Sequence, residues 1–415
     1  MPAATPSVRV LVVDPVDIAA PRSGGVLTFL LDFIKFAPPD FEITVAGVTE
    51  DPVARPIGKR IRVPIGTRAA WSLPLAPAGA IPRNPLRLAA LTFAQLRLRR
   101  EMLDGRRILQ VHRPYRRSIL AGLRGARVQF IHVDMRESPG PSGWWQPRWL
   151  YGESSDRALQ RCARVFVVNE SGAMMLRQRF PRIADRIEFL PVWFDGAIFR
   201  LPRAAERAEL RESVLARLGD VESAGRQRLI LFAGRIDQNK DPELAIDAFA
   251  ELTRTTNETC RLLIAGDGDM RAAAKARARE LGVAERVHLL GDLPREELAQ
   301  LMRACDVLLL TSRAEGGGPR VVVEALASGL PVVATPVGEV RRTVQHGING
   351  WLIQERSAAA VARGLRWVIE QPRGALAGAA ADCVAPYAAH ETLSHLYDAY
   401  RQLAADNEGG RHRTA

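Results

Sequence analysis

The chain has 415 residues, of which 47% are apolar and 25% are charged. At roughly 150 residues per domain, this length predicts two or three domains. The composition excludes intrinsic disorder, a collagen repeat and a disulfide-rich miniprotein. The formal net charge of +12 indicates an anionic partner, such as nucleic acid, a lipid surface or a phosphate-bearing substrate.

The four cysteines are isolated in the sequence, without a CxxC pair. This spacing supports neither a zinc site nor a disulfide framework, and it fits a reducing compartment. No apolar run approaches the ~18 residues that a membrane span needs, and the N-terminus lacks the pattern of a signal peptide. We therefore expect a cytoplasmic protein.

The first half of the chain opens with a β–α–β pattern. A strand is expected at 8–13, an apolar helix at 26–36 and a second strand at 42–48, which favours a parallel sheet. Residues 52–85 are rich in Pro, Arg and Gly and predict a long loop with one short strand at 60–64. Further strands are expected at 108–111, 128–132, 165–169 and 187–191.

A second β–α series follows residues 196–227, which we interpret as a linker and a surface helix. Strands are expected at 228–233, 261–265, 286–290, 307–311, 331–335 and 350–353. Helices are expected near 241–254, 269–281, 295–304 and 319–328, with a last helix at 391–403.

The predicted fold class is α/β, with two Rossmann-like doubly wound domains facing each other across a cleft. The predicted domains are residues 1–200 and 201–385, with a helix at about 386–405 packing back on the first and a disordered tail at 406–415. Ligands of such domains bind beyond the C-terminal ends of the strands, here most naturally between the domains.

The segment 312–335 carries the strongest functional signal. Three glycines follow a strand and let the backbone approach a ligand, and Pro319 is expected to begin a helix. The positive end of a helix suits a phosphate or diphosphate. Glu315 and Glu324 flank this turn, and carboxylates accept paired hydrogen bonds from the vicinal hydroxyls of a ribose or hexose. The alternative is a plain strand-to-helix turn with surface glutamates.

A second segment, 232–243, places Arg235 and Lys240 at the end of a strand and in the loop that follows. An arginine fork and a lysine point charge form a common pair for neutralising a diphosphate. Only four of the 58 basic residues are lysines, so Lys240 is the more informative of the two. Taken alone, the segment fits solvated surface equally well.

These segments resemble the retaining glycosyltransferases of GT-B fold, most closely glycosyltransferase family four, the group 1 glycosyl transferases. The resemblance is dense over 228–355 and looser in the first half. The shared motifs are Ala233-Gly-Arg-x4-Lys240, Ala265-Gly-Asp-Gly, Leu290-Gly291, Ser312-Arg-x-Glu-Gly, Glu324-Ala-Leu-Ala-x-Gly-x-Pro-Val-Val-Ala-Thr and Gly347-x-Asn-Gly-Trp-Leu. The looser ones are Gly24-Gly25, His132-Val-Asp134 and Pro191-Val-Trp-Phe-Asp195.

The resemblance implies a role for each matching position in the C-terminal half. Arg235 and Lys240 would neutralise the donor diphosphate, Glu324 would bind the ribose hydroxyls and Glu315 the donor sugar. Backbone groups would complete the donor site at Gly234, Leu290, Gly291, Gly317, Gly318 and Arg320. Of these, the amides of Gly317, Gly318 and Arg320 would cradle phosphate, and the backbone near Leu290 would face the base.

In the N-terminal half, the resemblance implies that Gly25 approaches the donor phosphates and that His132 contacts the transferred sugar. The implied catalytic residues are therefore His132, Glu315, Arg235 and Lys240.

One feature departs from the family pattern. The family separates its two glutamates by seven residues, whereas eight residues, 316–323, lie between Glu315 and Glu324 here. We expect the three glycines to absorb a one-residue bulge through unusual backbone dihedrals, so that Glu315 still reaches the sugar.

Two weaker signals are interpreted as structural. Asp267-Gly-Asp269 matches the acidic pair that holds a metal in the other large glycosyltransferase fold, but it lies in a glycine-rich turn where Asp commonly bonds the local backbone. No metal ligand, required metal or other cofactor is therefore expected. His112 follows a strand and is expected to be structural, with acceptor contact as the second interpretation.

A basic amphipathic helix is predicted at 83–100, and three tryptophans follow within 143–149. Core packing explains both segments, and so does attachment to an anionic membrane surface, which would place the protein at the inner face of the cell membrane. The tryptophans could also form a platform on which a sugar stacks. The arginines are scattered without a nucleic-acid-binding motif, so no nucleic-acid partner is expected.

The resemblance implies transfer of a sugar from a UDP- or GDP-linked donor to a hydroxyl of a carbohydrate or lipid-linked acceptor, with retention of configuration. Synthesis of the bacterial envelope, of extracellular polysaccharide or of glycolipid is the expected context. The alternatives are a nucleotide-sugar epimerase or a sugar phosphorylase of the same fold, and a non-catalytic protein that binds nucleotide sugars.

Overall fold

The structure is a computed structural model that describes residues 8–20, 25–78, 107–112, 125–132, 156–219 and 227–409. The chain divides into two compact units. The N-terminal unit comprises Met1–Leu190 and His390–Ala415, and the C-terminal unit comprises Pro191–Ala389. The chain thus leaves the first unit at residue 190, where the sequence analysis placed the boundary at 200.

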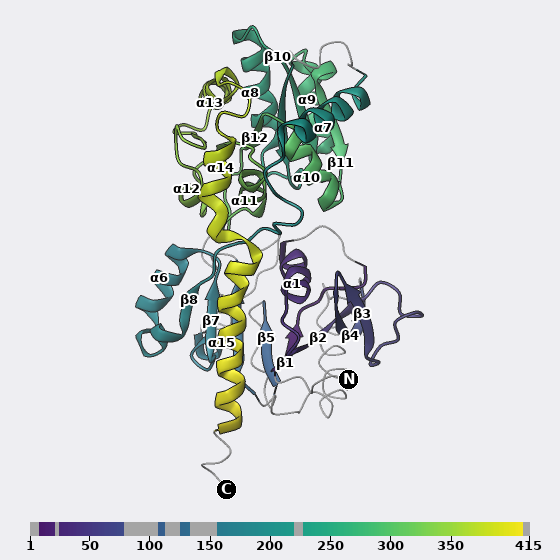
Figure 1. The fold of residues 1–415 in the computed structure, drawn as a ribbon, viewed down its shortest axis with the longest axis vertical. Helices are drawn as coiled ribbons and strands as arrows, with labels where there is room; N and C mark the ends of the chain where they lie inside the picture. The colour runs from purple at the N-terminus through teal and green to yellow at the C-terminus, as the bar shows by residue number, and fades with distance from the viewer. Residues whose placement is uncertain are drawn as a thin grey trace. The chain divides into compact units, whose positions relative to one another are not determined.

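The N-terminal unit is built on an eight-stranded sheet with the strand order β3-β4-β2-β1-β5-β6-β7-β8 (Figure 1). All neighbouring strands are parallel except β3 and β4. The strands are β1 (Val8–Val13), β2 (Phe41–Thr49), β3 (Ile61–Ile65), β4 (Arg68–Pro77), β5 (Arg107–Val111), β6 (Arg127–Ile131), β7 (Arg164–Val167) and β8 (Ile187–Phe189).

The hairpin of β3 and β4 corrects the prediction of a long loop over 52–85. The turn contains Gly66 at φ +59°, a left-handed conformation that glycine adopts easily. Prolines had argued against strands here, but Pro64 lies on the edge strand β3, where a missing amide donor is tolerated.

Helix α1 (Gly25–Lys35) and the last helix, α15 (Ala389–Gly409), pack together in the N-terminal unit. The Tyr397 hydroxyl donates a 2.7 Å hydrogen bond to the carbonyl of Phe33, and Arg401 pairs with Asp40 at 2.9 Å. Helix α15 continues over 406–409, which the sequence analysis assigned to a disordered tail, so the predicted start of the tail is wrong. The unit also contains α6 (Glu170–Arg179) and η1 (Pro181–Arg186).

The C-terminal unit has a parallel six-stranded sheet with the order β11-β10-β9-β12-β13-β14. Its strands are β9 (Gln227–Ala233), β10 (Thr259–Ala265), β11 (Val287–Gly291), β12 (Val307–Leu310), β13 (Val332–Ala334) and β14 (Gly350–Leu352). The strand order reverses between β9 and β12, and in open α/β sheets ligands bind beyond the carboxyl ends of the strands at this point.

Helices flank this second sheet (Figure 1). They are α7 (Ala204–Arg217), α8 (Pro242–Thr255), α9 (Arg271–Glu280), η2 (Ala284–Arg286), α10 (Arg295–Ala304), α11 (Arg320–Ala327), α12 (Val340–Thr343), α13 (Ala358–Glu370), α14 (Ala377–Val384) and η3 (Ala385–Tyr387). Alternate residues of β9 enter two different buried clusters: Leu229 and Leu231 join one, Ile230 and Phe232 the other. Since successive side chains of a strand point to opposite faces, both faces of the sheet are covered.

Several segments that the sequence analysis singled out lie outside the described residues. They are the basic segment 83–100, the tryptophan-rich segment 143–149, Gly24, Asp134 and residues 410–415. Within the part of the chain that is described, no helix combines the length and the apolar character needed to cross a membrane.

Candidate donor site

The loops that follow β9 and β12 are fastened to each other at the point where the strand order reverses. The amide of Arg313 donates to the carbonyl of Asn239 at 2.7 Å, and the Asn239 side chain bonds both the carbonyl and the amide of Ala314. The Thr311 hydroxyl also bonds the carbonyl of Lys240 at 2.9 Å. The two segments that the sequence analysis chose independently therefore form one site.

Lys240 and Glu315 form a direct ion pair within this site. Both side chains are largely buried, with 18% and 14% of their surface exposed. The resemblance implied that one contacts the donor diphosphate and the other the donor sugar. An ammonium group has three N–H donors, so Lys240 can bond Glu315 and a phosphate oxygen together.

Arg235 lies in a different environment from Lys240. Its side chain is 70% exposed, and its guanidinium lies 3.9 Å from the Asp237 carboxylate. Asp237 also accepts a 2.9 Å hydrogen bond from the amide of Lys240 and so shapes the loop. Arg235 is therefore close to the site along the chain but reaches into solvent.

Glu324 lies on α11 and is only 5% exposed. Its carboxylate forms an ion pair at 3.2 Å with Arg295, the first residue of α10. The Arg295 guanidinium in turn lies 5.4 Å from the centre of the Phe199 ring. Arg295 could not be singled out in the sequence because arginines are so abundant in this chain.

The glycine-rich turn before α11 is tightly packed. A Cβ atom on Gly318 would lie 2.9 Å from a methyl group of Val192, and a Cβ on Gly338 would lie 2.3 Å from the carbonyl oxygen of Gly317. The amide of Glu339 also donates to that carbonyl at 3.3 Å. Close packing thus explains the glycines at 318 in the turn and at 338 beside it.

None of Gly316, Gly317 and Gly318 has a left-handed backbone, so the extra residue between Glu315 and Glu324 is not absorbed through a left-handed glycine. Helix α11 begins at Arg320, with Pro319 as its N-cap, whereas Pro319 was expected to be the first helical residue. The first amides of a helix lack a carbonyl one turn earlier, so this end of α11 can bind an anion. The Arg320 guanidinium lies 5.3 Å from the ring of the buried Trp193.

Glycines also join the ends of β9, β10 and β11. The amide of Gly266 donates to the carbonyl of Gly291 at 2.7 Å, and the amide of Gly234 donates to that of Ala265 at 2.9 Å. Gly266 has φ +138°, and a Cβ there would lie 1.9 Å from the Gly234 carbonyl oxygen. The turn after β10 therefore links the end of β11, at Leu290 and Gly291, to the end of β9, after which Arg235 and Lys240 follow.

The acidic pair Asp267 and Asp269 lies in the turn that follows Gly266 and β10. The Asp267 carboxylate accepts a 2.8 Å hydrogen bond from the next amide, that of Gly268, and Arg271 approaches it at 3.9 Å. This is the local backbone bonding expected of Asp in a turn. Across the described residues, no group of three or more His, Cys, Asp or Glu side chains is arranged to hold a metal ion.

Two of the proposed site residues belong to the N-terminal unit. Gly25 is the first residue of α1, and a Cβ added to it would meet no atom within 4 Å. His132 follows β6, and its Nε2 lies 2.7 Å from the Nδ1 of His112, which is 5% exposed. The contacts of this histidine pair were not foreseen from the sequence.

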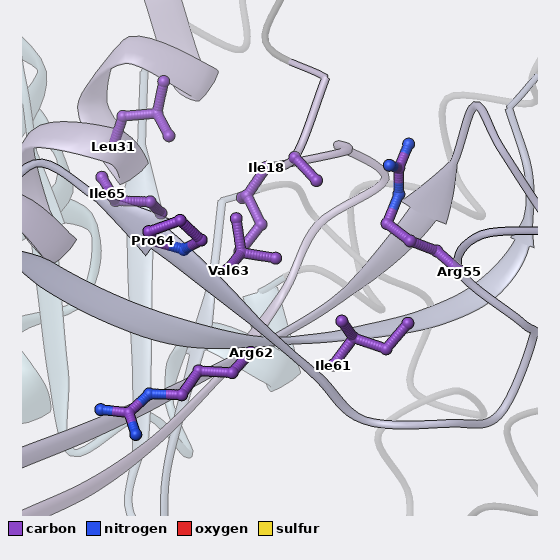
Figure 2. Close-up of a pocket in the computed structure, with 9 residues that line it drawn as sticks. Ile18, Leu31, Arg55, Ile61, Arg62, Val63, Pro64 and Ile65 are labelled. Atoms are coloured by element: carbon purple, nitrogen blue, oxygen red, sulfur yellow. The ribbon is translucent and has the colours of Figure 1, made fainter.

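A hollow of about 520 Å³ in the N-terminal unit does not contain any of these residues (Figure 2). Its wall is mostly apolar and includes Ile18, Leu31 and Val63. Arg55 and Arg62 also line the hollow, and Arg55 is paired at 2.9 Å with the buried carboxylate of Asp17. The hollow therefore lies apart from the residues that the sequence predicted for the donor site.

Comparison with solved structures supports the GT-B fold. Sucrose-phosphate synthase from Thermosynechococcus elongatus aligns over 96% of this chain and 99% of that one, with a TM-score of 0.76 and 18% identity. Anabaena HepE in complex with UDP-glucose aligns over 97% of this chain and 99% of that one, with a TM-score of 0.68 and 18% identity. The chain thus has the GT-B fold that the sequence predicted.

Comparison at the sequence level identifies the family. A D-inositol 3-phosphate glycosyltransferase of Nocardiopsis dassonvillei is 30% identical over 360 residues, which are 80% of each chain. D-inositol 3-phosphate glycosyltransferase 1 of Catenulispora acidiphila is 30% identical over 285 residues, 66% of this chain and 64% of that protein. The family profile described as "Glycosyl transferases group 1" matches residues 219–381, which include Arg235, Lys240, Glu315 and Glu324. The chain belongs to the group 1 glycosyl transferases.

Proposed function

We propose that this glycosyltransferase moves a sugar from a UDP- or GDP-linked donor to an acceptor hydroxyl with retention of configuration. The observation that carries the proposal is the Lys240–Glu315 pair, held by two interlocked loops where the strand order of the C-terminal sheet reverses. Glu324 lies one helical turn after Arg320, the first residue of α11, and supplies the second carboxylate.

The leaving group of such a reaction is a nucleoside diphosphate, on which negative charge develops as the sugar departs. Lys240, Arg235 and the first amides of α11 neutralise that charge. Glu315 accepts hydrogen bonds from the donor sugar and Glu324 from the ribose. Because the protein supplies the cations, the reaction needs no metal ion.

The acceptor is proposed to be a hydroxyl of a carbohydrate or cyclitol, carried on a small molecule or on a lipid. Relatives of this chain are named for D-inositol 3-phosphate and, at 32% identity over 222 residues in Streptomyces kanamyceticus, for 2-deoxystreptamine. Both names denote polyhydroxylated rings. The net charge of +12 favours an anionic acceptor or an anionic surface near it. We place the reaction in the synthesis of envelope or extracellular polysaccharide or glycolipid.

A non-catalytic nucleotide-sugar-binding protein is the second candidate, because eight rather than seven residues separate Glu315 from Glu324. Slow donor hydrolysis without acceptor distinguishes the two functions, since a protein that only binds the donor leaves it intact.

A thermal-shift screen with UDP, GDP and their sugars tests the proposal. A ligand that binds only the native state raises the apparent stability, by about 2.7 kcal/mol at a hundredfold excess over Kd. We expect one diphosphate series to raise the melting temperature and the corresponding nucleoside to do so much less. If neither series shifts the melting temperature, the proposed donor class is wrong.

A further inference from the structure

A hydrogen-bonded network of four polar side chains in the N-terminal unit connects Tyr400 to His132. The Tyr400 hydroxyl on α15 donates to Oε1, the side-chain amide oxygen of Gln110, at 2.7 Å. The Gln110 amide nitrogen lies 2.7 Å from the Nε2 of His112, and the Nδ1 of His112 lies 2.7 Å from the Nε2 of His132. These residues come from β5, from the end of β6 and from the last helix of the protein.

Aromatic packing holds both imidazole rings in place. The His112 ring stacks on Phe130 at 4.8 Å between centroids and on His132 at 5.0 Å. Phe29 on α1 sets its edge against both histidines, at 5.1 Å and 5.2 Å. Gln110 and Tyr400 are fully buried. The hydrogen bonds therefore join rings that cannot easily turn away from one another.

The chemistry of the groups fixes the direction of each hydrogen bond in this network, from donor to acceptor. An amide nitrogen only donates, so the Nε2 of His112 must accept from Gln110 and carries no proton. In the neutral ring the proton is then on Nδ1, which donates to the Nε2 of His132. His132 consequently accepts at Nε2 and carries its own proton on Nδ1.

Tyr400 sets the orientation of the Gln110 amide from which this direction follows. Burial raises the pKa of its hydroxyl well above the ordinary value, so the group stays protonated. Gln110 is the one hydrogen-bond partner of this hydroxyl among the described residues. If the amide were reversed, its nitrogen would face the hydroxyl oxygen and the buried hydroxyl hydrogen would lose its acceptor, which is costly.

We propose that Tyr400, Gln110 and His112 are positioning residues that hold His132 as the Nδ1–H tautomer. In this tautomer the Nδ1 of His132 is a hydrogen-bond donor and cannot act as a general base. The statement that the donated bond goes to the transferred sugar depends on the function proposed above. The statement about the tautomer does not depend on it.

The imidazole nitrogens can be examined directly by long-range ¹H–¹⁵N correlation spectra of protein with its seven histidines labelled. His132 is assigned from the signal that disappears in His132→Gln. At a pH where the rings are neutral, we expect protonated Nδ1 and bare Nε2 for His132, and the same for His112. A proton on the Nε2 of His132 would overturn the proposal, whether or not the enzyme is active.

Tyr400→Phe and Tyr397→Phe form a matched pair of variants. Each removes one buried hydroxyl from α15, but the Tyr397 hydroxyl bonds the carbonyl of Phe33 and does not belong to the network that reaches His132. Tyr400→Phe should release the Gln110 amide, give His132 a mixed tautomer and lower kcat on the order of tenfold with donor KM unchanged. Tyr397→Phe should change neither quantity.

Two further results would count against the proposal: a wild-type tautomer in Tyr400→Phe, or an equal loss of kcat in both variants. If Tyr400→Phe does not fold, the wild-type spectrum still decides the tautomer. A wild-type protein with the expected tautomer but without transfer activity would instead refute the proposed function and leave the tautomer assignment standing.

Discussion

The two units of this protein carry their functional side chains in different ways. In the C-terminal unit, Lys240, Glu315 and Glu324 lie on the loops and the helix that follow β9 and β12, which are neighbours in the sheet. In the N-terminal unit, the network that ends at His132 combines side chains from β5, β6 and a helix almost 300 residues further along the chain, as the 290-residue separation of Gln110 and Tyr400 shows.

This difference shows where sequence reasoning succeeds. A loop between a strand and a helix brings its residues together by local geometry, so their spacing is visible in the sequence. A network assembled from distant segments leaves no spacing to recognise.

Gly266→Ala should disrupt the close contact between the backbone of Gly266 and that of Gly234 in the C-terminal unit. The new Cβ would lie 1.9 Å from the Gly234 carbonyl oxygen at a residue with φ +138°. Backbone strain and overpacking together should lower the free energy of unfolding by about 2–5 kcal/mol, measured by denaturant titration. Gly378→Ala is the control, because its Cβ would meet no atom within 4 Å. Equal stability of the two variants would mean that the loops are not locked as described.

Glu324→Gln should lower turnover by at least an order of magnitude, or about 1.4 kcal/mol of activation free energy. The amide keeps the shape of the side chain but loses the charge that faces Arg295 at 3.2 Å and that we propose strengthens bonds to ribose hydroxyls. Circular dichroism should show an intact fold. The exposed Glu297→Gln on the adjacent helix α10 should retain full activity, and wild-type turnover in Glu324→Gln would refute the assignment.

Binding to lipid vesicles should depend on the basic segment 83–100 of the N-terminal half and not on the nucleotide site. If the acceptor is lipid-linked, the wild-type protein should sediment with anionic vesicles at low salt, less with neutral vesicles, and less again at high salt. Replacing Arg97, Arg99 and Arg100 by Gln should reduce sedimentation, at about 1 kcal/mol for each side chain near the surface. Nucleotide binding should stay unchanged. Wild-type protein that ignores anionic vesicles would favour a soluble acceptor.

Removal of metal ions should have the smallest effect. Transfer or donor hydrolysis should continue in the presence of a chelator, because Lys240 and Arg235 are proposed to neutralise the diphosphate. Activity that is lost with chelator and restored by magnesium or manganese would give Asp267 and Asp269 a role as ligands, in place of their role in the turn.

The sequence predicted most strands of both sheets, since their apolar runs alternate with loops at regular intervals. Strand β4 was not predicted, because the prolines of 52–85 indicated a loop. The segment instead forms a hairpin whose turn contains Gly66. The sequence revealed Lys240 and Glu315 by their motifs but not the ion pair between them, which depends on side-chain reach. Arg295 and Gln110 left no signal, because their roles come from tertiary neighbours rather than from spacing along the chain.

Calorimetric titration of the nucleoside diphosphate that the wild type binds is the most direct test of the C-terminal unit as the donor site. Lys240→Ala should weaken binding by about 1.5–3 kcal/mol, roughly 10- to 150-fold, because a charge-assisted contact is lost. The exposed Lys275→Ala on α9 should bind as the wild type does, and the nucleoside alone should not distinguish the three proteins. If Lys240→Ala binds the diphosphate as tightly as the wild type, the donor site does not lie between the loops after β9 and β12.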